Sequence, residues 1–215
     1  MQNTASQIQY WNRVASQKSF SHPLRADWLT PRLPSGAYIL DVGCGYGRTL
    51  QQLLEAGFPN CVGLDVSEGM LARYRSEVHS ARLVRNDGHD FPLQHESVDA
   101  VLLFAVLTCI PADTEQLYLV NEVRRVLRPG GLLYISDLLV NQDARNRERY
   151  QRCERRFGRY GVFELPEGVV VRHHSEEWIR EITRPFERLE YEPFNVTTMN
   201  GNSSSAFQYL GWRSN

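Results

Sequence analysis

The sequence predicts an α/β protein with a doubly wound, mainly parallel sheet and an antiparallel edge strand. Between residues 37 and 139, short apolar runs alternate with segments of helical periodicity, which is the order of βαβ units. Val98–Phe104 is almost continuously apolar, as expected for a strand buried on both faces of a parallel sheet. The glycine-rich stretch Gly43–Gly47 follows the first run, so we expect a ligand site at the carboxyl ends of the strands.

Five strands are expected in the core, and two more follow near the end of the chain. Each core strand is a short run rich in apolar residues. The five are Ala37–Val42, Cys61–Leu64, Ala81–Arg85, Val98–Phe104 and Leu132–Ser136. The two late strands, Phe186–Thr197 and Ala206–Trp212, complete a seven-stranded sheet, and the polar loop between them is too long for a tight hairpin.

Three helices are expected to connect the core strands. Tyr46–Ala56 carries leucines at helical spacing, and Ser67 is expected to cap a second helix with Glu68 in its first turn. Asp113–Gln116 has the pattern of a capping box and opens the third helix, which Pro129-Gly130-Gly131 is expected to end. The apolar side of this third helix is expected to hold Leu117, Val120, Val123, Val126 and Leu127.

The pattern after residue 139 is less regular. Asp143–Phe157 predicts a helix, Phe157–His174 predicts a hairpin or lid, and Ser175–Thr183 predicts a short helix that begins at a serine cap. We expect a single domain with four parts. These are an N-terminal arm (1–35), a cofactor-binding core (36–139), a lid or insertion (140–175), and a C-terminal helix with edge strands (176–215).

Composition and charge exclude several classes of protein. The formal net charge is −1, so no overall basic field draws the chain to nucleic acid or to a membrane surface. No window of 18 residues is continuously apolar, and the first residues lack the charged and apolar regions of a signal peptide. We therefore expect a cytoplasmic protein without a membrane partner, and the sequence leaves monomer and homodimer open.

The cysteines indicate neither a metal site nor a disulfide framework. Cys44, Cys61, Cys109 and Cys153 lie far apart, and none belongs to a CxxC pair or to a cluster with histidines. We expect reduced thiols and no structural metal.

The glycine turn departs from two familiar nucleotide-binding patterns. Its glycines stand at 43, 45 and 47, so Arg48 occupies the third glycine position of the dinucleotide pattern, and no phosphate-loop lysine follows. Asp41 precedes the turn and would repel a pyrophosphate but attract an ammonium or sulfonium group. Asp65 lies 24 residues later, where an acid usually accepts the ribose hydroxyls, and Asp87 at the end of the third strand can accept from an adenine amino group. These acids suit an adenosine with a cationic tail and no phosphate.

Four segments resemble motifs of the class I S-adenosylmethionine-dependent methyltransferases. They are ILDVGCGYGR, GLDVSEGML, NDGHDFPL and LRPGGLLYISD, and the resemblance covers Ala37 to Leu139. It implies a Rossmann-like sheet, methyl transfer, and S-adenosylmethionine as cofactor with S-adenosylhomocysteine as product. The expected cofactor-binding residues are Asp41, Gly43, Cys44, Gly45, Asp65, Val66, Met70, Asp87, Gly88 and Phe104, with Tyr10 and Trp11 of the arm closing over the donor.

The sequence says less about the methyl acceptor than about the methyl donor. The fourth strand is followed by Phe104-Ala105-Val106-Leu107 and not by [DN]PP[YF], which argues against methylation of amino groups on DNA bases. The acceptor atom stays open among O, N, S and C, and a base is needed only if the acceptor must lose a proton. The acceptor-side candidates lie in the expected lid. They are Tyr160, Arg172, His173 and His174, of which Arg172 and His174 would share one strand face.

We favour a small-molecule methyltransferase that aligns its acceptor under a lid for an in-line displacement. Arg145–Arg159 holds seven arginines and two glutamates, and on a helix this basic stripe would either contact RNA phosphates or form a solvated face. The balanced charge of the chain favours the solvated face and a small-molecule partner. A protein of the same fold that binds the cofactor without methylating is a second alternative.

Overall fold

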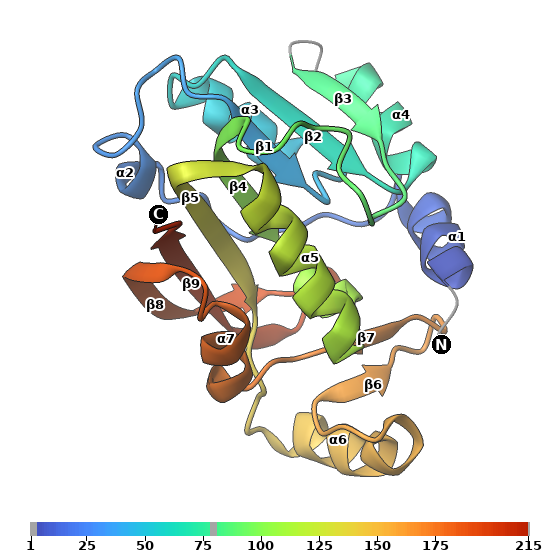
Figure 1. Cartoon of the computed structure of the whole chain (residues 1–215). Helices are drawn as coiled ribbons and strands as arrows, with labels where there is room; N and C mark the ends of the chain where they lie inside the picture. Colours follow the sequence, from blue (N-terminus) through green and yellow to red (C-terminus); the bar gives the residue numbers. More distant parts are fainter. Residues whose placement is uncertain (1–3, 78–80, 215) are drawn as a thin grey trace.

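The computed structural model describes residues 4–77 and 81–214, so residues 1–3 of the expected arm, 78–80 and 215 lie outside the described part. Figure 1 shows a central twisted sheet flanked by helices. The strands of the large sheet are β1 Ile39–Val42, β2 Cys61–Asp65, β3 Arg82–Arg85, β4 Val98–Phe104, β5 Leu127–Leu138, β8 Glu187–Thr197 and β9 Ser203–Trp212. A small second sheet pairs β6 Val162–Glu164 with β7 Val170–Arg172.

Seven α-helices and one short 3₁₀ helix are described. They are α1 Thr4–Val14, α2 Ala26–Leu29, α3 Arg48–Glu55, α4 Glu68–Glu77, the 3₁₀ helix η1 Leu107–Cys109, α5 Asp113–Val126, α6 Ala144–Phe157 and α7 Glu176–Ile182. In the described part of the chain, no helix has the length and apolar character needed to cross a membrane.

The large sheet has the order β3-β2-β1-β4-β5-β9-β8. The first five strands are parallel, with Ile39 opposite Cys61 on β2 and opposite Ala100 on β4. Strand β9 is antiparallel to both β5 and β8, and Tyr134 of β5 lies opposite Leu210. The predicted seven-stranded, mainly parallel sheet is confirmed. The strand order reverses between β1 and β4, which is where such sheets bind ligands.

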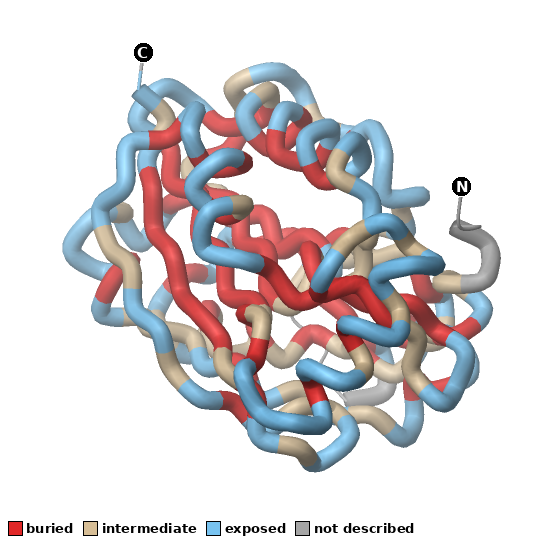
Figure 2. Tube along the Cα trace, turned by 90° about the horizontal axis from the view of Figure 1, so that it is seen from below, coloured by how far each residue is buried: buried red, intermediate tan, exposed pale blue. Residues whose placement is uncertain are grey.

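Two apolar cores lie on opposite faces of this sheet. One core joins the strands to α5 and α7, and the other joins them to α2, α3 and α4. Figure 2 shows the buried strands running through the centre of the molecule between exposed outer segments. Burial on both faces explains why Val98–Phe104 reads as an almost uninterrupted apolar run.

A third, smaller core joins α1 to the segment 140–175, which we call the lid segment. Tyr10 and Val14 of α1 pack against Tyr150 of α6 and against Phe163 and Val171 of the small sheet. Gln7 adds a hydrogen bond of 2.7 Å from its side-chain amide to the carbonyl of Val170. The beginning of the chain is therefore held against a segment about 150 residues later in the sequence.

Local signals predicted several helix ends correctly. The Ser67 hydroxyl accepts a hydrogen bond from the N–H of Met70, and the Ser175 hydroxyl accepts one from the N–H of Trp178. Asp143 caps α6 in the same way. Each cap satisfies a backbone N–H at a helix start that has no partner within the helix.

The start of α5 differs from the predicted capping box. Ala112 is the N-cap and makes no side-chain capping bond. Gln116 is buried and donates to the carbonyls of Leu107 and Ile110, and this turns Leu117 outward, where it is 40% exposed. The predicted apolar side was therefore wrong at Leu117.

The end of α5 also differs from the prediction. The helix stops at Val126 and β5 begins at once at Leu127, so the Pro129-Gly130-Gly131 stretch lies within the strand and does not end the helix. Leu127 already pairs with Val98, and a register irregularity then absorbs the proline and glycines.

Asp113 serves as an anchor for the lid segment. Its carboxylate accepts from Arg172 at 2.7 Å and also pairs with Arg159. Arg172 is only 2% exposed, and its second hydrogen bond goes to the carbonyl of Pro111. A buried guanidinium needs a carboxylate partner, so this contact fixes β7 against the first turn of α5.

We expect Asp113→Ala to destabilise the protein strongly, because the substitution leaves Arg172 buried without its carboxylate. The expected loss in the free energy of unfolding is about 3 kcal/mol, the lower end for a broken buried pair, since Asp113 is partly exposed. Urea unfolding measures it. The exposed Glu148→Ala on α6 is the control and should change stability by less than about 0.5 kcal/mol. Equal stability of the two variants would show that the pair does not fix the lid segment.

Candidate functional site

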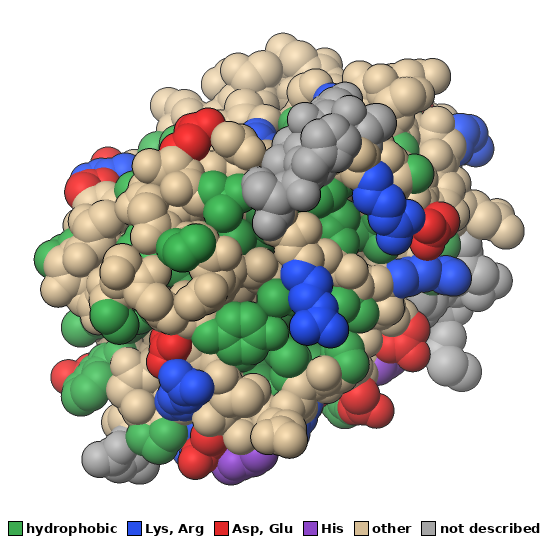
Figure 3. Space-filling view, turned by 90° about the horizontal axis from the view of Figure 1, so that it is seen from above, with side chains coloured by type: hydrophobic (Ala, Val, Ile, Leu, Met, Phe, Trp, Pro, Cys, Tyr) green, Lys and Arg blue, Asp and Glu red, His purple; other side chains and the backbone are tan. Residues whose placement is uncertain are grey.

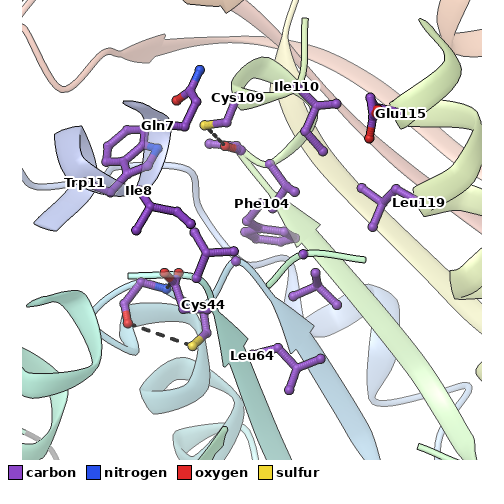
Figure 4. Close-up of a pocket in the computed structure, with 18 of the residues that line it drawn as sticks. Gln7, Ile8, Trp11, Cys44, Leu64, Phe104, Cys109, Ile110, Glu115 and Leu119 are labelled. Carbon is purple, nitrogen blue, oxygen red and sulfur yellow. Dashed lines mark hydrogen bonds between the residues drawn. The ribbon is translucent and has the colours of Figure 1, made fainter. Parts of the chain in front are cut away.

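A cavity of about 1100 Å³ lies at the carboxyl ends of β1, β2 and β4. Its floor is the glycine turn after β1 with the ends of β2 and β4, and its walls come from α1, the first turns of α5 and the lid segment. In Figure 4, Phe104 lies in the middle, with Ile8 and Trp11 of α1 on one side and Ile110 and Leu119 on the other. The cavity thus lies where the topology of the sheet predicts a ligand site.

The glycine turn requires its glycines for conformation and for space. Gly43, Gly45 and Gly47 have φ values of +68°, +55° and +77°, a region that favours glycine. A Cβ atom at Gly43 would lie 2.6 Å from Val106, and one at Gly47 would lie 1.9 Å from the ring of Tyr74. A Cβ at Gly45 would meet nothing closer than Phe20 at 3.8 Å. Gly43 and Gly47 therefore allow close packing, and Gly45 leaves open space toward the cavity.

Asp65 ties this turn to the end of β2. One carboxylate oxygen accepts the N–H of Gly45 and the other accepts the N–H of Ser67, each at 2.8 Å. Burial raises the pKa of the Asp65 carboxyl, and the backbone N–H groups of Ser67, Gly45 and Val66 oppose that rise. A carboxylate has about four acceptor positions, so Asp65 can also accept from a ligand.

Asp41 lies beneath the turn and does not itself line the cavity. It is 1% exposed, and its Oδ2 atom has no hydrogen-bond partner among the described residues. Burial raises the pKa of Asp41 to about 8, while the nearby guanidinium of Arg48 lowers it and Asp65 raises it. A buried acceptor without a donor is costly, so a ligand that brings a positively charged N–H group would satisfy it.

The loop after β3 forms one end of the cavity. Asp87 and Gly88 line it and are exposed, and Gly88 has a φ of +88°. Val66 and Met70, from the end of β2 and from α4, line the same cavity. Asn86 accepts the N–H of Gly88 and so fixes the turn.

The turn after β4 lies against the glycine turn. Ala105 has a φ of +57°, which is uncommon for a residue with a side chain. Its N–H donates to the carbonyl of Ser136 at 2.8 Å, and its carbonyl accepts from the thiol of Cys109. These two bonds hold Phe104 and Val106 at the cavity floor.

Some aromatic residues of the arm line the cavity, and one is buried in an apolar core. Trp11 lines the cavity, and its ring lies 6.0 Å from that of Phe20, which stacks on Tyr46 at 5.7 Å. Tyr10 does not line the cavity. It is 3% exposed and belongs to the core between α1 and the lid segment.

Cys44 lines the cavity, and its surroundings disfavour the reactive thiolate form. It is 7% exposed, and burial raises the pKa of its thiol well above the ordinary value. A protonated, buried thiol is unreactive. In the described part of the chain, no three histidine, cysteine or acidic side chains gather as a metal site.

The structure does not bring Tyr160, Arg172, His173 or His174 to the cavity. Arg172 and His174 both face α5, as strand alternation predicts. The ring of His174 contacts Gln116 and the Leu138 carbonyl, and burial lowers its pKa to about 3.

His173 faces the other way, toward α6, where it contacts Tyr150 at 2.6 Å and Asn141 at 3.3 Å. Burial lowers the pKa of His173 well below its usual value. Tyr160 is 37% exposed, and it lines a second hollow of about 340 Å³ beside Arg172 and His173. In this structure the four predicted acceptor-side residues belong to the packing and surface of the lid segment.

Sequence reasoning missed several residues that line the cavity. Gln7 and Ile8 precede Trp11 by four and three residues, so the helical period of α1 carried a signal for them. The others have no local signal, because the path of the chain brings them together. Among them are Arg48, Cys109, Ile110, Glu115, Leu119, Arg156, Phe157 and Val162.

The matched family model and most of the similar curated relatives are named as methyltransferases. Residues 40–135 match the family model described as a methyltransferase domain. The chain is 36% identical over 107 residues to phthiotriol/phenolphthiotriol dimycocerosates methyltransferase of Mycobacterium leprae, with 48% of this chain and 38% of that relative covered. It is 32% identical over 110 residues to a tRNA N(3)-cytidine methyltransferase of Gallus gallus, with 46% and 30% covered. The chain therefore spans less than half the length of these curated relatives.

The fold is also that of a solved methyltransferase. An S-adenosylmethionine-dependent methyltransferase from Methanosarcina mazei superposes with a TM-score of 0.81 over 87% of this chain and 97% of that chain. The identity of 22% means that this likeness concerns the fold.

Two observations fit S-adenosylmethionine, the cofactor that these likenesses imply. The unpartnered Oδ2 of Asp41 suits the ammonium of a methionine tail, and the open space over Gly45 lets a ligand approach the backbone. Asp41, Asp65 and Asp87 lie at or near the carboxyl ends of β1, β2 and β3, and this arrangement suits an adenosine without phosphate.

Asp65→Asn should weaken binding of S-adenosylhomocysteine, because the amide offers fewer acceptor positions and no charge. The expected loss is about 1.5–3 kcal/mol, or roughly 10- to 150-fold in Kd, measured by calorimetric titration. Glu187→Gln, an exposed acid on the far edge strand, is the control and should bind as the wild type does. An unchanged Kd for Asp65→Asn would remove Asp65 from the binding site.

Binding of S-adenosylmethionine at pH 7 should release roughly one proton, since a cation beside Asp41 lowers a pKa that burial has raised to about 8. Titrations in buffers of different ionisation enthalpy measure the release. At pH 9.5 Asp41 is already ionised, so the release should disappear. Asp41→Asn should abolish it at pH 7, and an unchanged release in that variant would assign the proton to another group.

Proposed function

We propose that this chain is a class I S-adenosylmethionine-dependent methyltransferase and that it transfers a methyl group from that cofactor to a small-molecule acceptor. The observation that carries this proposal is the single continuous cavity. The glycine turn and its acids form one part of it, and apolar side chains of α1, α5 and the lid segment form the rest. A shared cavity lets donor and acceptor meet in line.

The donor side of the proposal rests on residues that already have fixed geometry. Asp65 would accept the ribose hydroxyls, and Asp87 with Gly88 would lie beside the adenine. Asp41 would balance the ammonium of the methionine tail through its free oxygen. The half-buried guanidinium of Arg48 lines the cavity and has no ion pair in the described part of the chain, which suits a carboxylate.

S-adenosylmethionine, when bound, supplies an electrophilic methyl group on a cationic sulfur, and the leaving thioether needs no acid. The tasks that remain for this chain are to exclude water and to align the acceptor. The core between the arm and the lid segment supports exclusion of water, because Tyr10 and Val14 belong to the same apolar cluster as Tyr150 and Phe163. The arm and lid would thus form the roof over the acceptor.

A small-molecule acceptor fits the walls of the cavity. Apart from the acids of the donor end, most of the wall side chains are apolar or aromatic. Arg156 also lines the cavity, but it forms an ion pair with Glu164. The Mycobacterium leprae relative is named for methylating phthiotriol and phenolphthiotriol dimycocerosates, which are not nucleic acids.

An RNA acceptor is the alternative that a specific observation favours. Arg145, Arg147, Arg152 and Arg155 of α6 are exposed, and none has an ion pair in the part of the chain that the structure describes. Helix α6 lies at the lower end of the molecule in Figure 1, so its arginines form a basic surface there. By contrast, basic and acidic side chains are interspersed on the face seen from above in Figure 3. The Gallus gallus relative is named as a tRNA methyltransferase.

Incubation with methyl-labelled S-adenosylmethionine separates these functions. A metabolite extract should acquire label at least 10-fold above a no-enzyme control, whereas total RNA should not. The double variant Arg152→Glu/Arg155→Glu reverses the charge of two of the four exposed arginines of α6 that lack an ion pair in the described structure, and it should label small molecules within twofold of wild type. Label in RNA that this variant loses would support the alternative. Tight binding of S-adenosylhomocysteine without transfer to either pool would indicate a non-methylating protein.

A further inference from the structure

Residues 20–25 of the arm cross the sheet beside the cavity and are fixed at both ends. We call them the crossing segment. Four hydrogen bonds tie it to the glycine turn and to three strands, β8, β9 and β5. They run from Phe20 N–H to the Tyr46 hydroxyl (3.0 Å), from the Ser21 hydroxyl to the Thr197 carbonyl (2.5 Å), from the Gln208 amide to the Pro23 carbonyl (2.5 Å), and from Arg25 N–H to the Tyr134 hydroxyl (3.1 Å). A side chain in this segment is therefore held in place before any ligand arrives.

His22 lies in the middle of the crossing segment and lines the cavity. It is 6% exposed, its Nδ1 lies 2.9 Å from the hydroxyl of Ser136, and the ring of Phe194 contacts it edge-on at 6.0 Å. Ser136 lies opposite Phe104, the last residue of β4. The imidazole is thus oriented directly beside the cavity floor.

The second ring nitrogen of His22 is left for a ligand. In the described structure no hydrogen bond reaches Nε2, yet this atom is not among the enclosed polar atoms without a partner. It therefore keeps access to the cavity that the ring lines. By contrast, both nitrogens of His174 contact protein groups, and His173 is enclosed between Tyr150 and Asn141.

The imidazole is neutral at neutral pH. Burial, together with the nearby charge of Arg48, lowers the pKa of His22 to about 4. A neutral imidazole carries one N–H and one lone pair. If Nδ1–H donates to the Ser136 hydroxyl, the lone pair on Nε2 can accept a proton from the cavity.

We propose that His22 is the catalytic base of this enzyme and that its acceptor is a hydroxyl group on a largely apolar small molecule. As the acceptor oxygen bonds to the methyl carbon, the S–C bond breaks with its electron pair left on sulfur, and the hydroxyl proton passes to Nε2. The cavity loses the sulfonium charge as it gains the imidazolium charge, so burial does not oppose the step with a new net charge. The inference rests on the proposed methyl transfer and names its acceptor class.

The apolar walls support the second half of the proposal. Ile8 and Trp11 of α1, Ile110 before α5, and Phe157 and Val162 of the lid segment all line the cavity. They suit a hydrocarbon or aromatic skeleton and leave His22 to receive its hydroxyl.

The tautomer of His22 tests the base without any acceptor. In ¹⁵N-histidine-labelled protein bound to S-adenosylhomocysteine, we expect Nδ1 to carry the proton and Nε2 to be bare at pH 7. The signal that disappears in His22→Gln assigns the resonance, and His95→Gln, an exposed histidine, is the matched control. A proton on Nε2 would overturn the proposal, because that nitrogen could then only donate.

A matched set of naphthalenes tests the acceptor class. Of 1-naphthol, 1-naphthylamine and 1-naphthoate, we expect wild type and His95→Gln to methylate 1-naphthol. His22→Asn keeps a polar group at the Nδ1 position and lacks Nε2, and it should lose turnover by roughly 100-fold or more. His22→Gln keeps an acceptor at the Nε2 position but cannot take a proton. Its KM should stay within about threefold of wild type, while its kcat should fall by roughly 100-fold or more.

Cofactor binding and the choice of substrate separate failure of the proposed base from failure of the proposed function. Both His22 variants should bind S-adenosylhomocysteine within twofold of wild type, and a larger loss would place His22 in the cofactor site and overturn the proposal. Methylation of the amine or the carboxylate in preference to the naphthol, or of none of the three, would overturn the hydroxyl class. Failure of wild type to bind S-adenosylhomocysteine would instead refute the proposed function.

Discussion

The carboxylate of Asp65 holds the site together. By accepting the N–H groups of Gly45 and Ser67, it joins the turn after β1 to the turn after β2 and to the start of α4. The three positive φ angles of the glycine turn are compatible with a packed structure because this carboxylate fixes the turn from the side. Pairing of β1 with β2 and β4 places Asp41 below the turn, and the Asp65 contact fixes the turn at the floor of the cavity.

The roof of the cavity depends on contacts between distant parts of the sequence. Helix α1 has little to bury on its own, and the lid segment has only a two-stranded sheet and one helix. Together they make a small apolar core, and Arg172 anchors that core to α5 through Asp113. A two-stranded sheet is marginal alone, so its packing against both α1 and α6 is what gives it a fixed structure. This small core therefore joins α1 to the lid segment, and both of these contribute residues to the walls of the cavity.

The strand-end residues that line the cavity were predictable from sequence, and most residues of its other walls were not. Asp65, Asp87 and the glycines stand at strand ends, where local pattern and sheet topology alone determine the location. His22 has no such signal, because it reaches the cavity only through four long-range hydrogen bonds of the crossing segment. His173 and His174 attracted attention as a histidine pair, but the lid segment turns one toward α6 and the other toward α5. The capping box predicted at the start of α5 was wrong for the same reason. The carboxylate of Asp113 forms ion pairs with Arg159 and Arg172 of the lid segment and does not cap the helix.

The place of β9 in the sheet has a consequence for synthesis of the chain. Strand β5 is complete at Leu138, but its outer neighbour begins only at Ser203, after the 64 residues 139–202. While those residues are being added, β5 is the open edge of a nascent sheet, with its backbone groups unpaired. That edge of β5 is covered only when β9 inserts between β5 and β8. Strand β9 therefore protects the edge of β5 from pairing with other chains.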